Sequence, residues 1–140
     1  MNAYLDSSFV VSLYLTDAHS LEARQRVTSG GWFVLTPLHF AEWAHAIAQH
    51  QFRGTLSAQK AREINALFLA DQRTGLWQPV GLPENCFQRC VDLAHGYGAT
   101  IGVRTLDSLH VACALELKAE RFWTFDERQA KLAKAQGLKA

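Results

Sequence analysis

Short apolar runs alternate with longer segments of helical spacing along the whole chain. The runs WFVLT (32–36), LWQPV (76–80) and RFWTF (121–125) have the length and composition of buried strands. The chain opens with a further apolar run that ends at Asp6 and passes into a helix. Because each short run is followed by a helical segment, the pattern predicts an α/β fold with a short parallel sheet covered on both faces.

Helix boundaries are indicated by proline, hydroxyl or acidic residues at the start and by glycine at the end. The segments predicted as helices are 17–31, 37–54, 57–75, 83 to about 95, a stretch from 105, and one opening at 126. The stretch TLDSLHVACALEL, which starts at Thr105, is apolar on nearly every side. It is therefore predicted to be a buried helix capped by Thr105.

Length and composition predict one domain spanning residues 1–140, since 140 residues with 49% hydrophobic side chains can form one continuous core. The early apolar stretch 9–15 is too short to cross a bilayer, and no basic leader with a small-residue cleavage site precedes it. We therefore expect a cytoplasmic protein without membrane association. Cys86, Cys90 and Cys113 lack the C-x-x-C spacing, which favours buried thiols over disulfides or a zinc site.

Net charge argues against a protein that coats nucleic acid, because 14 Lys and Arg residues nearly balance 13 Asp and Glu residues. Basic residues still gather in the last quarter of the chain, at Lys118, Arg121, Arg128, Lys131, Lys134 and Lys139. They form either a surface that follows phosphates or an ordinary solvated helix face.

Four acids stand apart by their positions in the predicted elements. Asp6 and Asp126 directly follow strands, whereas Glu42 and Asp107 lie near the starts of helices. The carboxyl ends of parallel strands share one edge of a sheet, so these four side chains are expected to converge. The simpler alternative is that Asp6, Asp107 and Asp126 cap or stabilise helix starts and that Glu42 is a surface acid.

Converging carboxylates repel one another and require either protonation or a cation. Ligands that are all oxygen favour a hard ion such as Mg²⁺ or Mn²⁺. Such an ion activates water and neutralises charge on a phosphodiester. The acid pattern therefore predicts metal-dependent phosphodiester hydrolysis.

The motifs YLDSSFVV, VRTLDSLHVACALEL and FWTFDERQAKLAKAQGL, with Glu42 after the second strand, resemble in order those of the PIN-domain nucleases, in particular the VapC-like toxins. The resemblance covers essentially the whole chain. It implies a three-layer α/β/α sandwich around a short parallel sheet and a Mg²⁺- or Mn²⁺-dependent endoribonuclease that cleaves RNA. It also implies a small antitoxin as partner and a homodimer. Relatives often continue into a last edge strand, which is expected to be short or absent here, where the sequence ends in GLKA.

The resemblance also implies roles for individual residues. Asp6, Glu42, Asp107 and Asp126 become the catalytic acids, with Asp6, Asp107 and Asp126 as the metal ligands. Ser8 resembles a hydroxyl that orients a carboxylate or a water, with a helix cap as the alternative. Arg104 is expected either to contact phosphate or the acidic cluster or to form an ordinary surface ion pair.

Other residues and sequence patterns bear on alternative functions. His110 suggests a zinc ligand or a proton shuttle, but its apolar helix favours a hydrogen-bonded core histidine. The sequence contains no H-E-x-x-H, G-x-S-x-G, P-loop or G-x-G-x-x-G pattern. Two alternatives stay open: a catalytically silent PIN-like binding or regulatory module, and a metal-dependent phosphatase or phosphodiesterase that acts on DNA.

Overall fold

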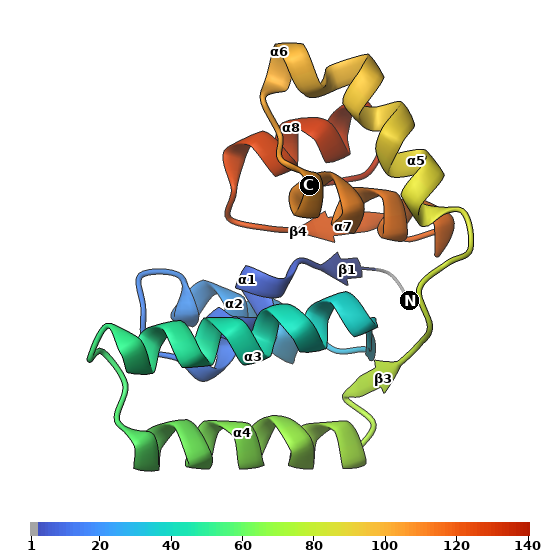
Figure 1. The fold of residues 1–140 in the computed structure, drawn as a ribbon. Coiled ribbons are helices and arrows are strands. Elements are labelled where there is room, and N and C mark those ends of the chain that lie inside the picture. Colours follow the sequence, from blue (N-terminus) through green and yellow to red (C-terminus); the bar gives the residue numbers. More distant parts are fainter. Residues whose placement is uncertain (1–2) are drawn as a thin grey trace. The chain divides into compact units, whose positions relative to one another are not determined.

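The computed structural model describes residues 3–140, which form two compact units (Figure 1). Unit 1 consists of residues 3–6 together with 81–140, and unit 2 consists of residues 7–80. The chain therefore leaves unit 1 after Asp6 and returns to it at Gly81. No helix in the described part of the chain combines the length and apolar character that a membrane crossing requires.

Unit 1 is built on two parallel strands. Strand β1 (Ala3–Leu5) pairs with β4 (Arg121–Trp123), with Ala3 opposite Arg121 and Leu5 opposite Trp123. The helical elements are α5 (Cys86–Leu93), the π-helical turn η1 (Ala94–Gly98), α6 (Ala99–Ile101), α7 (Thr105–Glu116) and α8 (Glu127–Ala135). One further parallel bridge joins Arg121 to Lys139, so the expected last edge strand is reduced to this bridge.

The core of unit 1 contains the buried helix that the sequence predicts. Residues 108–114 of α7 are all buried, in agreement with their apolar composition. Tyr4 of β1 stacks on Phe122 of β4 with ring centroids 5.6 Å apart, and its hydroxyl lies 2.8 Å from His110 Nδ1. His110 is thus a hydrogen-bonded core histidine, as its position on an apolar helix indicated.

The three cysteines are free thiols buried in unit 1, as predicted. Burial raises the pKa of the Cys113 thiol to about 12, and the neighbouring Cys86 adds to this increase. Burial also raises the pKa of Cys90. Thiols with raised pKa values are poor nucleophiles at neutral pH, which agrees with a packing role.

We expect Tyr4→Phe to lower the free energy of unfolding by about 1–3 kcal/mol, because it keeps the aromatic ring but removes a buried hydroxyl hydrogen-bonded to His110. Urea denaturation of both proteins measures the difference. Tyr97→Phe, at a half-buried position of η1, is the control. Equal changes in the two variants would show that the Tyr4 hydroxyl contributes nothing specific.

Unit 2 is also built on two parallel strands. Strand β2 (Phe33–Leu35) pairs with β3 (Trp77–Pro79), with Phe33 opposite Trp77. Its helices are α1 (Ser7–Tyr14), α2 (Ser20–Thr28), α3 (Pro37–Phe52) and α4 (Ala58–Arg73). Ser57 caps α4 by accepting the Lys60 N–H, and Pro37 is the first residue of α3, as the sequence predicts.

Aromatic side chains fill the core of unit 2. Trp43 of α3 stacks on Phe68 of α4 at 4.0 Å, and Tyr14 of α1 meets both rings edge-on. The Trp77 indole N–H donates to the Tyr14 hydroxyl at 2.6 Å, and this hydroxyl donates to Asp71 at 2.5 Å. Burial and the Asp71 carboxylate raise the Tyr14 pKa well above its ordinary value, so the hydroxyl stays protonated and α1 is joined to α4.

The structure confirms the predicted α/β class, with helices in excess and short parallel strands. Several boundaries differ from the prediction. Helix α2 starts only at Ser20, because Asp17 forms a turn in which its backbone N–H donates to Ser20 Oγ. The helix expected from Pro83 begins at Cys86, and Thr105 is not a cap but the first residue of α7, since Arg104 occupies the cap position with extended backbone.

Candidate active site

Three of the four predicted acids belong to unit 1. Asp6 directly follows β1, and its N–H donates to the Trp123 carbonyl at 3.1 Å, which extends the β1–β4 ladder by one residue. Asp6 is buried, since only 5% of its surface is exposed. Asp107 lies in the first turn of α7, and Asp126 caps α8 by accepting the Gln129 N–H at 2.7 Å.

A hydrogen-bond network connects these three acids through Thr124 and Gln129. The Thr124 hydroxyl lies 3.2 Å from Asp6 Oδ2 and 2.8 Å from Gln129 Oε1, and it accepts the Asp126 N–H at 3.0 Å. Gln129 Nε2 donates to the carbonyl oxygen of Asp107 at 3.1 Å. The positions of Asp6, Asp107 and Asp126 are therefore interdependent.

Sequence reasoning assigned no role to Thr124 or Gln129. Thr124 stands two residues before Asp126, and this T-x-D spacing at a strand end was the available signal. Gln129 gave none, because a glutamine in a polar helix such as α8 is ordinarily solvated. The structure buries Gln129 completely, which makes its hydrogen bonds obligatory.

Arg104 lies beside Asp107 at the start of α7. Its Nε is 3.8 Å from Asp107 Oδ2, and the Arg104 side chain is 87% exposed whereas that of Asp107 is 30% exposed. A pair at this distance and exposure adds little to stability. The contact with one of the predicted acids is thus present, and the contact of Arg104 with phosphate stays a prediction.

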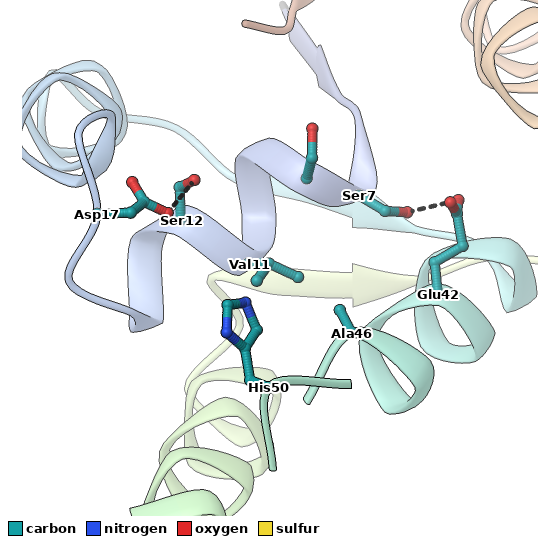
Figure 2. Close-up of a pocket in the computed structure, with 8 residues that line it drawn as sticks. Ser7, Val11, Ser12, Asp17, Glu42, Ala46 and His50 are labelled. Carbon is teal, nitrogen blue, oxygen red and sulfur yellow. Dashed lines mark hydrogen bonds between the residues drawn. The ribbon is translucent and has the colours of Figure 1, made fainter. Parts of the chain in front are cut away.

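Glu42 lies in unit 2, on α3, where its Oε1 accepts a hydrogen bond from Ser7 Oγ at 2.9 Å (Figure 2). Ser7 is the residue that follows Asp6 in the chain. Ser7 and Glu42 line a pocket of about 290 Å³, whose other lining residues are Ser8, Val11, Ser12, Asp17, Ala46 and His50. Ser8 is an exposed residue of α1.

Asp17, at the far end of the same pocket, remains ionised at neutral pH. Burial alone would raise its pKa, but hydrogen bonds from the His19 backbone N–H and from the Ser12 and Ser20 hydroxyls outweigh burial and lower the pKa. The Ser12 hydroxyl donates to Asp17 Oδ2 at 2.9 Å, as Figure 2 shows. The lining of this pocket in unit 2 therefore includes the carboxylates of Glu42 and Asp17 together with serine side chains.

The donor chemistry of unit 1 fits a hard divalent cation, because Asp6, Asp107 and Asp126 supply only carboxylate oxygens. Within residues 3–140, no three His, Cys, Asp or Glu side chains form a ready-made metal cluster. Mg²⁺ is usually held by one or two carboxylates, with waters and substrate phosphate as its other ligands. The acids of unit 1 therefore suit an ion that is completed by water and substrate.

Residues 3–135 match the sequence profile of the PIN domain, and the chain belongs to this family. The comparison with curated protein sequences gives no match.

Solved structures give the more particular likeness. VapC20 from Mycobacterium tuberculosis, described as a sarcin–ricin loop cleaving toxin, is 14% identical, with a TM-score of 0.70 over 98% of this chain and 96% of that one. VapBC2 from Rickettsia felis, bound to promoter DNA, is 12% identical, with a TM-score of 0.67 and coverage of 99% and 96%. A toxin–antitoxin complex from Klebsiella pneumoniae is 15% identical, with a TM-score of 0.64 and coverage of 99% and 97%. The chain thus has the fold of VapC proteins, which confirms the predicted resemblance.

Proposed function

We propose that this protein is a metal-dependent endoribonuclease and the toxin of a toxin–antitoxin pair. The observation that carries the proposal is the network in which Thr124 and Gln129 connect Asp6, Asp107 and Asp126, within a chain of the PIN domain family. VapC20, which shares the fold, is described as cleaving the sarcin–ricin loop, an RNA element. This likeness supports RNA over DNA as the substrate.

Asp6, Asp107 and Asp126 are proposed to hold Mg²⁺ or Mn²⁺. When bound, the ion supplies an activated water and neutralises charge on the phosphodiester. Asp6 is suited to this role because its backbone is fixed by the strand ladder and its carboxylate is largely excluded from bulk water. Asp126 is held by the first turn of α8, and Asp107 by the start of α7.

The other predicted residues are assigned on their own contacts. Glu42 is proposed as the fourth catalytic acid, and within unit 2 the Ser7 hydroxyl holds its carboxylate in a fixed orientation. The hydroxyl of Ser8, an exposed residue, is proposed to orient a water or a carboxylate. Arg104, exposed beside Asp107, is proposed to contact a substrate phosphate.

The purified protein is expected to cleave total RNA in the presence of Mn²⁺ or Mg²⁺ and to stop when the ion is chelated. Gel analysis of RNA with each metal, with excess EDTA, and with EDTA followed by added Mn²⁺ tests this expectation. A DNA duplex and a DNA single strand incubated in parallel test the alternative of a DNA phosphodiesterase. Undiminished cleavage in EDTA would remove the metal mechanism, and no cleavage of any substrate would favour the silent binding module.

A small antitoxin is proposed as the inhibitory partner, since one of the similar structures is described as a toxin–antitoxin complex. Clustered carboxylates attract a basic side chain as well as a metal ion, so an inserted arginine would occupy the place of the cation. The product of a small reading frame next to this gene should therefore co-purify with the protein and block RNA cleavage. A tight complex that retains full activity would contradict this arrangement.

The homodimer and the cytoplasmic location remain predictions.

A further inference from the structure

Gln129 is a fully buried polar side chain whose amide is oriented by its surroundings. Its Nε2 faces the carbonyl oxygen of Asp107, an atom that can only accept a hydrogen bond. The amide oxygen Oε1 must then face the Thr124 hydroxyl, 2.8 Å away, where it can only accept. The orientation of this amide therefore follows from its two partners.

The Thr124 hydroxyl has two possible acceptors but carries only one proton. Gln129 Oε1 lies at 2.8 Å and Asp6 Oδ2 at 3.2 Å, so the distances favour donation to Gln129. The Asp126 N–H donates to the same hydroxyl oxygen at 3.0 Å, which further limits its rotation. Gln129 thus competes with Asp6 for this proton.

We propose that Gln129 is a positioning residue of the acidic site, which directs the Thr124 hydroxyl proton away from Asp6. The inference rests on the proposed function, because it concerns the ability of Asp6 to bind a divalent cation. A proton donated by Thr124 and a bound cation would share the electron density of the same atom, Asp6 Oδ2, so directing the proton to Gln129 leaves more of that density for the ion. Residues that orient metal ligands typically change metal affinity by about 10–100-fold when they are replaced.

The test measures Mn²⁺ binding to the full chain by isothermal titration calorimetry without RNA. Gln129→Met removes the amide at similar volume, which leaves the Thr124 proton to Asp6. Mn²⁺ affinity should fall about tenfold or more. The matched control is Gln136→Met, since Gln136 is a half-buried residue at the C-cap of the same helix. This variant should leave the Mn²⁺ affinity unchanged.

A double-mutant cycle separates this role from packing. A Thr124→Val protein lacks the hydroxyl proton for which Gln129 and Asp6 compete. Adding Gln129→Met to this protein should therefore lower Mn²⁺ affinity much less than Gln129→Met does when Thr124 is present. An equal loss in both backgrounds would mean that Gln129 acts through packing, and it would overturn the proposal. Thermal melts establish that each variant is folded.

Gln129→Leu provides a second variant that does not depend on Gln129→Met folding, because it also removes the amide. It should lower Mn²⁺ affinity about tenfold or more beside the native Thr124 and much less in the Thr124→Val protein. A loss of the same size in both backgrounds would overturn the proposal. If the wild type itself does not bind Mn²⁺, both the proposed function and this inference are overturned. If the wild type binds Mn²⁺ and Gln129→Met binds it with the same affinity, only the inference is overturned.

Discussion

Asp6→Asn is expected to reduce RNA cleavage by at least about 100-fold, because replacing a direct ligand should cost more than replacing a residue that orients one. Asparagine has the shape of aspartate, but it lacks the negative charge that attracts Mg²⁺ or Mn²⁺. Cleavage rates with saturating Mn²⁺ measure the effect. Expression of the wild type should also arrest growth, and Asp6→Asn should relieve the arrest.

The control for this experiment is Asp92→Asn, which makes the same charge change at an exposed position of α5 in unit 1. This variant should cleave RNA at the wild-type rate. Thermal melts and measured protein levels are needed for both variants, since an unfolded protein would also fail to cleave. An Asp6→Asn protein that is folded, accumulates normally and remains equally active would show that Asp6 has only a structural role.

Phe122→Ala is expected to lower the free energy of unfolding by about 3–5 kcal/mol. Phe122 is 0% exposed and stacks on Tyr4, so its removal leaves a cavity at the pairing of β1 with β4. This loss is a large part of the 5–15 kcal/mol that holds typical proteins folded. The variant should therefore also lose the arrangement of Asp6, which continues β1. Urea denaturation monitored by circular dichroism measures the loss.

Phe52→Ala supplies the matched comparison, because Phe52 at the end of α3 is 89% exposed. The same truncation there should change stability by no more than about 0.5 kcal/mol. If the two substitutions cost the same, burial of Phe122 would not be what stabilises unit 1.

The hydrophobic pattern predicted the strands and most helices because it depends on local spacing and on end signals. Pro37 begins α3 and Ser57 caps α4 as expected, and Asp126 is both the acid after a strand and the cap of α8. The strand predicted at 121–125 ends at Trp123 instead. Beyond the end of this strand, the Thr124 hydroxyl forms hydrogen bonds with the Asp126 N–H and with Gln129 of α8.

The candidate site was predictable only in its acids. Their order along the chain and their places at element ends are sequence features, whereas the burial of Gln129 depends on how α8 packs in the folded unit. The competition between Gln129 and Asp6 for one proton depends on distances that no spacing in the sequence gives. The convergence of Glu42 with the other acids stays a prediction, because Glu42 lies in unit 2.

The pairing of β1 with β4 sets an order of events during synthesis. Ala3 to Leu5 are made before the whole of unit 2, whereas their partners Arg121 to Trp123 are made only after it. A ribosome therefore has to translate all of unit 2 before Asp6 can be held in the ladder and before Thr124, Asp126 and Gln129 exist to contact it. A nascent chain that has not yet reached β4 and α8 lacks the assembled acids, so the proposed activity can arise only after both elements have been made.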